Sequence, residues 1–452
     1  MNLDRIHSIY FIGIGGIGMS ALARYFHVNG RTVSGYDRTS TSLTQELAGE
    51  GIKIHYEENL ELIPKDVDLV VYTPAIPEDH AELNYYRHHH YHVVKRSDLL
   101  EALTKNLFTI AVAGTHGKTT TTSMIAHILK DSGYDCTAFL GGISANYHSN
   151  FLIGKNNTVV VEADEYDRSF LKLHPDLAVI TSCDADHLDV YGDEETVVKA
   201  YGDFANLIKP GGMLITKQGL PFLAYYSRLN TMFYSVSDDT DFKAANMRLD
   251  NGTYVFDLTT PEFSIAGIHL SVAGFHNVEN AVAAGAIATQ LNIEQGKIRD
   301  ALSSFKGVRR RFEFIVRNEK VVFIDDYAHH PKEISTFLRS VSEIFPGRKI
   351  TCIFQPHLYT RTRDFADGFG SSLSLADEVI LLPIYPAREL PIEGVTSEML
   401  LEKISVPSKK VTDKQYLISE LQQREVDVLL TVGAGDIDQL VEPIAKFLES
   451  NV

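Results

Sequence analysis

The chain has 452 residues, which predicts two to four domains because single hydrophobic cores seldom grow beyond about 250–300 residues. Hydrophobic residues make up 44% and charged residues 22%, which excludes a disordered, collagen-like or coiled-coil chain. The 42 basic and 59 acidic residues give a net charge of −17, so we expect no nucleic-acid binding, and an anionic ligand would need local positive groups.

The cysteines and the apolar runs indicate a cytoplasmic protein with no membrane insertion. Cys136, Cys183 and Cys352 lie far apart and form no CxxC pair, as expected in a reducing compartment. No apolar run approaches the roughly 20 residues needed to cross a bilayer. Segment 9–19 is apolar, but its glycines argue against a signal peptide and favour a strand, a turn and a helix. We expect a monomer or a weak homodimer.

Short apolar runs alternate with helical patterns along the chain, which predicts parallel sheets of the α/β class. The runs assigned to buried strands are 8–12, 32–36, 68–72, 109–113, 158–161, 177–180, 321–324, 350–354, 378–382 and 427–432. Glycine-rich turns near residues 13 and 114 predict two separate nucleotide-binding folds, and a third set of strands follows three consecutive arginines at 309–311. We therefore predict three domains, 1–106, 107–311 and 312–452, with Rossmann-like folds at both ends and a P-loop ATPase-type parallel sheet between them.

The first glycine-rich turn, Gly13-Ile14-Gly15-Gly16-Ile17-Gly18, satisfies the pattern GxGxxG between a strand and a helix. Missing β-carbons let the backbone approach a diphosphate, and the open N–H groups of the helix start bind its charge. Asp37 ends the next strand, where a ribose-binding acid is expected. The motif fits NAD, another diphosphate such as a UDP-sugar, or a tight turn without a ligand.

The second turn, Gly114-Thr115-His116-Gly117-Lys118-Thr119-Thr120, follows the strand 109–113 and precedes a predicted helix over 123–130. It is the shortened phosphate-binding form GxxGKT, since Val112 replaces the first glycine of the full pattern. Its backbone N–H groups would cradle phosphates, Lys118 would neutralise β/γ charge, and the Thr119 hydroxyl would bind Mg²⁺. Lysine and threonine contribute little to packing here, so a purely structural turn explains this motif poorly.

Acidic and imidazole groups follow two later strands, and the carboxyl ends of parallel strands meet at one edge of a sheet. Glu162 and His187 are therefore the predicted Mg²⁺ ligands beside Thr119. Asp164, Glu165 and Asp184 fit a solvated acidic loop equally well.

Together these motifs resemble the Mur ligase family of ATP-dependent amino-acid ligases, and the resemblance covers essentially the whole chain. The segments that carry it are 13–20, 114–122, 162–167, 186–189, 276–281, 307–313, 325–331 and 354–364. The resemblance is closest to the branch that joins L-alanine to UDP-N-acetylmuramate, the first amino-acid addition of peptidoglycan synthesis. It implies a third domain that closes over the other two.

The resemblance also implies a role for each site residue. The residues implied to bind the UDP-sugar are Gly15, Gly16, Ile17, Gly18, Met19, Ser20, Asp37, Thr73 and Ala75. The residues implied to bind ATP are Gly114, Thr115, His116, Gly117, Lys118, Thr119, Thr120, Asn277, Asn280, Arg310 and Asp326. Catalytic roles fall to Lys118, Glu162, His187, His329 and Arg361, and the metal ligands are Thr119, Glu162 and His187.

The chemistry implied is transfer of the ATP γ-phosphoryl group to the lactyl carboxylate, followed by attack of the alanine amine on the acyl phosphate. His329 would take the proton of the incoming ammonium, and Arg361 would bind the alanine carboxylate. Leu358 departs from the arginine that the family often has after Gln-Pro-His. The alternatives are a murein peptide ligase, which attaches a recycled tripeptide, an NAD-dependent dehydrogenase and a non-catalytic nucleotide sensor.

Overall fold

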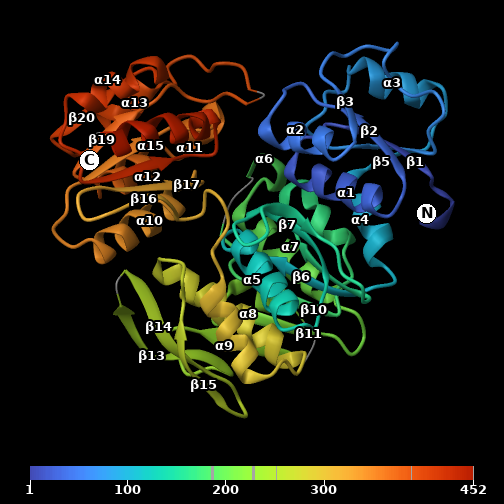
Figure 1. Cartoon of the computed structure of the whole chain (residues 1–452), viewed down its shortest axis with the longest axis horizontal. Coiled ribbons are helices and arrows are strands. Elements are labelled where there is room, and N and C mark those ends of the chain that lie inside the picture. The colour runs from blue at the N-terminus through green and yellow to red at the C-terminus, as the bar shows by residue number, and fades with distance from the viewer. Residues whose placement is uncertain (185–187, 227–229, 251, 388, 451–452) are drawn as a thin grey trace. The chain divides into compact units, whose positions relative to one another are not determined.

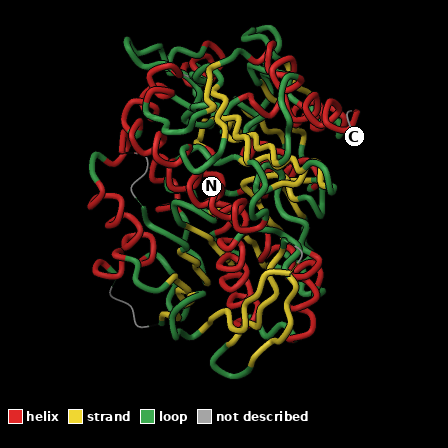
Figure 2. The backbone as a smooth tube through the Cα atoms, turned by 90° about the vertical axis from the view of Figure 1, so that its left-hand side faces the viewer, coloured by secondary structure: helices red, strands yellow, loops and turns green. Residues whose placement is uncertain are grey.

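A computed structural model describes residues 1–184, 188–226, 230–250, 252–387 and 389–450 (Figure 1). The chain forms three α/β domains, each built on its own sheet. Helices and strands alternate along much of the chain (Figure 2). The residues group into two compact units: unit 1 holds Met1–Asn246, Phe256–Ile268 and Glu279–Lys306, and unit 2 holds Met247–Val255, His269–Val278 and Gly307–Val452.

The N-terminal sheet is parallel, with the strand order β3-β2-β1-β4-β5. Its strands are β1 (Ser8–Ile12), β2 (Thr32–Tyr36), β3 (Lys53–His55), β4 (Leu69–Tyr72) and β5 (Val93–Lys95). Its helices are α1 (Ile17–Val28), α2 (Ser42–Gly49), α3 (Ala81–His88) and α4 (Arg96–Thr104). The order reverses between β1 and β4, and such a switch point opens a ligand crevice at the carboxyl ends of the strands.

The central sheet has ten strands in the order β15-β14-β13-β12-β11-β10-β6-β9-β7-β8. Its strands are β6 (Phe108–Ala113), β7 (Thr137–Ser144), β8 (Ser149–Leu152), β9 (Thr158–Glu162), β10 (Leu177–Ile180), β11 (Met213–Lys217), β12 (Thr231–Ser235), β13 (Phe242–Asp250), β14 (Thr253–Thr259) and β15 (Ser264–His269). Its helices are α5 (Lys118–Asp131), α6 (Leu188–Tyr191), α7 (Glu194–Asn206), α8 (Phe275–Gln290) and α9 (Gln295–Ser304). The sheet is mixed, because β8 runs antiparallel to β7 while β6, β9, β10, β11 and β12 pair in parallel.

The C-terminal sheet has the order β16-β17-β21-β18-β19-β20, and only its pairing of β16 with β17 is antiparallel among the described pairs. Its strands are β16 (Glu313–Arg317), β17 (Val322–Asp326), β18 (Ile350–Phe354), β19 (Glu378–Leu381), β20 (Ser408–Val411) and β21 (Val428–Val432). Its helices are α10 (Pro331–Ile344), α11 (Tyr359–Asp364), α12 (Ala366–Leu373), α13 (Ser397–Glu402), α14 (Leu417–Gln422) and α15 (Val441–Ser450).

The strand predictions are confirmed, since all ten predicted runs coincide with strands to within two residues at each end. The helix predicted over 123–130 begins earlier, at Lys118, because α5 packs against β6, β7 and β9 and this burial outweighs the low helix propensity of its four threonines. Among the described residues, no helix combines the length and the apolar character needed to span a membrane.

Within unit 1, helix α1 of the N-terminal domain packs on β7 and β8 of the central domain. Asn150 on β8 holds the first turns of α1 by donating from Nδ2 to Ile17 O at 2.7 Å and to Ser20 Oγ at 2.8 Å. Its Oδ1 accepts from Arg24 Nη1 at 2.6 Å. These buried bonds fix the start of α1 against the central sheet.

Candidate active site

The first glycine turn joins β1 to the start of α1, as the pattern predicts. Gly13 adopts φ +85°, and its N–H and that of Ile14 donate to Tyr36 O at 2.8 and 3.0 Å. Gly16 precedes helix α1, and no described side chain caps that helix start. The positive end of the helix dipole is therefore available to an anion.

Asp37 braces this turn. Its Oδ2 accepts from the Gly15 N–H at 2.8 Å, and its Oδ1 accepts from the Thr39 N–H at 3.1 Å. A β-carbon on Gly15 would lie only 2.8 Å from Asp37 Oδ2, so glycine is needed for this approach. In this structure the carboxylate holds the turn itself, and its predicted contact with the sugar nucleotide stays a prediction.

A cavity of about 340 Å³ opens in front of the first turn of α1. Six of the nine residues predicted for UDP-sugar binding line it: Gly16, Ile17, Gly18, Met19, Thr73 and Ala75. Its wall on the central domain includes Gly141, Glu162 and Asp164. Gly15 and Asp37 shape the turn, as described, and Ser20 is buried against Asn150. The cavity thus extends from the first glycine turn to the predicted metal ligand Glu162.

Arg96, which belongs to no recognisable sequence motif, is the one basic side chain among the described residues that line this cavity. It begins α4, and a β-carbon on Gly18 would lie 3.0 Å from its Nη1. Its Nη2 lies 3.8 Å from Asp164 Oδ2. The guanidinium therefore lies against the start of α1. Its charge and the positive end of the α1 helix dipole together favour an anionic ligand group.

The second glycine turn, residues 114–117, joins β6 to α5 as expected of GxxGKT, and we call it the cradle. Gly114 adopts φ +138° and Gly117 φ +83°, and Gly117 immediately precedes the first helical residue, Lys118. Thr181 and Ser182, which follow β10, brace the turn: Thr181 Oγ1 donates to His116 O at 2.5 Å, and His116 N donates to Ser182 Oγ at 2.8 Å. A β-carbon on Gly114 would lie 2.0 Å from Thr181 Oγ1, which excludes larger residues there.

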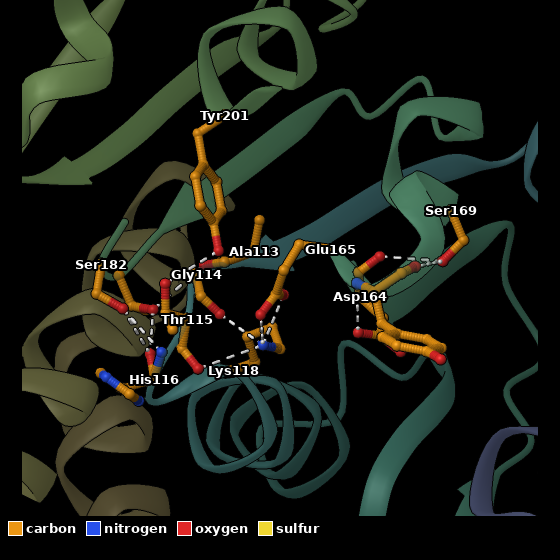
Figure 3. Close-up of polar contacts among 12 residues, drawn as sticks. Ala113, Gly114, Thr115, His116, Lys118, Asp164, Glu165, Ser169, Ser182 and Tyr201 are labelled. Carbon is orange, nitrogen blue, oxygen red and sulfur yellow. Dashed lines mark hydrogen bonds and ion pairs between the residues drawn. The ribbon is translucent and has the colours of Figure 1, made fainter. Parts of the chain in front are cut away.

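Two further turn residues contact the loop after β10. Thr115 Oγ1 donates to Asp184 O at 2.9 Å. The same oxygen lies 3.3 Å from the Tyr201 hydroxyl (Figure 3). His116 Nε2 lies 3.5 Å from Asp184 Oδ2. The loop after β10 therefore fixes the shape of the cradle from one side.

Lys118 forms a buried ion pair with Glu165 (Figure 3). Its Nζ donates to Glu165 Oε1 at 2.9 Å, to Oε2 at 2.7 Å and to Gly114 O at 2.6 Å. Burial lowers the pKa of the Lys118 ammonium, but the carboxylates of Glu165, Asp164 and Glu162 outweigh burial and raise that pKa above its usual value. Lys118 is therefore a cation, and Glu165 is not the solvated loop residue that the sequence left open.

The oxygen donors beside Lys118 fit Mg²⁺ chemically. Thr119 lies at the start of α5 and Glu162 at the end of β9, and a hydroxyl with a carboxylate suits an ion that keeps waters and takes further oxygens from phosphates. Gly141 leaves room for the Glu162 carboxylate, because a β-carbon at position 141 would lie 1.9 Å from Glu162 Oε2. The third predicted ligand, His187, lies outside the described residues.

Of the two asparagines implied to bind ATP, Asn280 lies beside the cradle in unit 1. Its Oδ1 accepts from Thr121 Oγ1 at 3.1 Å and would lie 2.7 Å from a β-carbon on Gly117. Thr120 is buried in the first turn of α5. Asn277 belongs to unit 2, where its Nδ2 donates to Ala273 O at 2.6 Å.

In the third domain, Arg310 makes an intradomain network. Its Nε donates to Asp325 Oδ2 at 3.0 Å and its Nη2 to Gly433 O at 2.6 Å. The Asp326 carboxylate accepts from Phe312 N at 2.7 Å and from Ala328 N at 2.8 Å. Burial raises the pKa of Asp326 to about 6. The ATP-binding roles implied for Arg310 and Asp326 stay predictions.

His329, His357 and Arg361 gather near the carboxyl ends of β17 and β18. The rings of His329 and His357 lie 6.1 Å apart between centroids, and Arg361 Nη1 lies 3.5 Å from His357 Nδ1. The neighbouring His330 caps α10, where its Nδ1 accepts from Lys332 N at 3.3 Å. Leu358 adopts φ +70° where α11 begins, a conformation that a branched side chain seldom tolerates.

Comparison with known families matches three consecutive family descriptions to this chain. They are "Mur ligase family, catalytic domain" over residues 8–107, "Mur ligase middle domain" over 112–288 and "Mur ligase, glutamate ligase domain" over 310–435. Together they span most of the chain in the order of its three sheets.

Individual relatives agree. The chain is 50% identical to the UDP-N-acetylmuramate–L-alanine ligase of Flavobacterium psychrophilum over 454 residues, which covers 99% of this chain and 100% of that protein. The UDP-N-acetylmuramate-alanine ligase structure from Thermotoga maritima superposes with a TM-score of 0.84 at 29% identity, covering 98% of this chain and 100% of that one. A murein peptide ligase structure from Psychrobacter arcticus has a TM-score of 0.76 at 24% identity over 97% and 98% of the two chains, a likeness of fold alone. The chain belongs to the Mur ligase family.

Proposed function

We propose that this protein is an ATP-dependent ligase that joins L-alanine to the lactyl carboxylate of UDP-N-acetylmuramate and releases ADP and phosphate. One structural observation carries the proposal: the cavity lined by the first glycine turn reaches Glu162 at the end of β9, and the loop that follows continues to Glu165, which contacts Lys118 of the cradle. A sugar nucleotide and a triphosphate bound at these two turns would meet along segment 162–165.

The chemistry follows from what a carboxylate needs. A carboxylate resists attack by an amine because its charge repels nucleophiles and oxide is a poor leaving group. In the first step, a lactyl oxygen bonds to the γ-phosphorus and the bond to ADP breaks. In the second, the amine attacks the acyl carbon, phosphate leaves, and the ammonium proton passes to a base.

The residues have the following proposed roles. Lys118 and the N–H groups of the cradle offset phosphate charge, and Mg²⁺ held by Thr119, Glu162 and His187 would add the charge neutralisation that crowded oxyanions require. Arg96 and the start of α1 hold the anionic part of the sugar nucleotide. His329 accepts the proton, and Arg361 binds the alanine carboxylate. Because the reaction consumes ATP, we also propose that the protein works in the cytoplasm. We further propose that it is a monomer or a weak homodimer.

The alternative hypotheses differ in support. The dehydrogenase hypothesis does not explain Lys118 or the glycine turn before it. Membership of the Mur ligase family also argues against that hypothesis. The murein peptide ligase hypothesis rests on a likeness at 24% identity, whereas the alanine ligase hypothesis rests on full-length identity of 50%.

A coupled assay of ADP release tests the proposal. Purified protein receives ATP, Mg²⁺ and UDP-N-acetylmuramate with L-alanine, glycine, L-serine or the murein tripeptide, and each substrate is omitted in turn. We expect ADP only when the sugar nucleotide and an amino acid are both present, fastest with L-alanine. Faster release with the tripeptide would favour the alternative ligase, and no release with any acceptor would refute the proposed reaction.

A further inference from the structure

The ammonium of Lys118 is fully engaged by protein groups in this structure. It carries three hydrogens, and its partners within the described residues are Gly114 O at 2.6 Å and the two Glu165 oxygens at 2.9 and 2.7 Å, with Thr115 O more distant at 3.4 Å (Figure 3). A phosphate oxygen can therefore reach Lys118 as a close partner only if one of these contacts is given up.

Glu165 is built into this position. Its side chain is 4% exposed and that of Lys118 is 12% exposed, so the pair lies largely out of water. The Tyr191 hydroxyl donates to Glu165 O at 2.6 Å, and nearby the Ala163 N–H donates to Val112 O at 2.8 Å, which fixes the backbone on either side of the carboxylate. Such a contact differs from a surface ion pair, whose partners exchange with water at little cost.

The carboxylate also has the chemistry of the ligand that the cradle is shaped for. It presents two anionic oxygens to the lysine that follows Gly117, as a phosphate group would. We propose that Glu165 is a positioning residue: it holds Lys118 in the cradle while the site is empty and competes with the nucleotide phosphates for the ammonium. This inference deepens the proposed function, since it concerns the same ATP site.

The proposal predicts an unusual gain on mutation. Glu165→Gln keeps the shape of the side chain but removes the competing charge, so nucleotide should bind more tightly, by about tenfold, because each 1.4 kcal/mol of lost competition is a factor of ten. Glu165→Asp keeps the charge on a shorter arm and should tighten binding by only about two- to threefold. Both variants should unfold at lower temperature without nucleotide, since Lys118 loses its partner or its best geometry.

Calorimetric titration with ADP tests this, with Mg²⁺ and with the metal removed by a chelator. Asp239→Asn is the matched control, because it removes the carboxylate of an exposed ion pair, Lys243–Asp239, in the same unit, and its ADP affinity should equal that of the wild type. Tighter binding by the glutamine variant in the metal-free arm supports the proposal. A purely structural role for Glu165 would lower the unfolding temperature and leave the affinity unchanged, which would overturn the proposal.

Two further outcomes are equally decisive. Weaker binding confined to the Mg²⁺ arm would make Glu165 a metal ligand and would overturn the proposal. If Glu165→Gln does not fold, the aspartate variant decides by the same criterion. Because ADP binding needs neither alanine nor the sugar nucleotide, the result stands even if the proposed ligase reaction fails.

Discussion

Replacing Gly141 with alanine would drive a methyl group into the carboxylate that we propose as a magnesium ligand. A β-carbon at position 141 would lie 1.9 Å from Glu162 Oε2 and 2.5 Å from Glu162 Cδ, far inside van der Waals contact. Gly141 lies within β7 and outside the left-handed region, so alanine adds no backbone strain there. The substitution therefore acts on Glu162 and on little else.

The magnitude follows from the overlap. The carboxylate has to move by more than 1 Å, and a displacement of that size in a reacting array costs on the order of 100-fold in rate. Overpacking of this kind costs typically about 1–3 kcal/mol of stability, which leaves most domains folded. We expect kcat/KM for the ligase reaction to fall about 100-fold, with a higher Mg²⁺ concentration needed for half-maximal rate.

The coupled ADP assay across a Mg²⁺ series measures both effects. Gly49→Ala is the control, because a β-carbon at position 49 meets nothing within 4 Å. In the double variant G141A/E162D the shorter side chain leaves room for the added methyl group. Its activity relative to the wild type should therefore exceed the product of the relative activities of the two single variants. Wild-type kcat/KM for Gly141→Ala at every Mg²⁺ concentration would show that the position of Glu162 does not matter to the reaction.

Two other substitutions test further residues of the site, and a third tests the pH dependence of stability. Lys118→Ala should abolish ADP release while a thermal melt still shows folded protein, and residual turnover above about 1% would contradict its role. Arg96→Ala should raise KM for UDP-N-acetylmuramate about 10- to 100-fold and leave KM for ATP within about twofold, and equal changes in both would contradict a dedicated sugar-nucleotide contact. Burial lowers the pKa of His276 to about 4, so between about pH 4 and 6.5 the unfolded chain binds more protons than the folded one, and stability is lost as the pH falls through that window. In denaturant unfolding, His276→Gln should lack this loss of about 3 kcal/mol, and identical pH slopes for both proteins would refute the assignment.

The sequence was sufficient to predict ten of the buried strands and both glycine turns, because these depend on neighbouring residues. A run such as 177–180 is apolar throughout and can only be a buried strand or a helix fragment, and turn residues on either side decide between the two. Gly117 adopts φ +83°, a conformation that glycine tolerates better than other residues. A glycine followed by a lysine at this turn therefore identifies the cradle from the sequence alone. For α5 the same local reasoning placed the helix start too late, because packing against the sheet is not visible in propensity.

The side chains that the sequence did not predict owe their position to partners far along the chain. Arg96 faces the turn at Gly18, and Glu165 pairs with Lys118, 47 residues earlier. Before the fold is known, an arginine at a helix start and a glutamate in an acidic loop look like ordinary surface residues. Gly141 carries no sequence motif at all, and only the position of Glu162 reveals why a side chain is excluded there.

The charges around the site explain why Lys118 is paired in the empty protein. Glu162, Asp164 and Glu165 raise the pKa of Lys118 together, so three carboxylates act on one ammonium. At an effective dielectric constant of about 20, one carboxylate at 4 Å changes the energy of a phosphate by about 4 kcal/mol, which is comparable to half the binding energy of a micromolar ligand. A triphosphate entering this field is repelled unless divalent cations accompany it or a carboxylate gives way. We therefore expect the carboxylates that hold the lysine in place to weaken nucleotide binding when Mg²⁺ is absent, and we expect this effect to become smaller when the charge of Glu165 is removed.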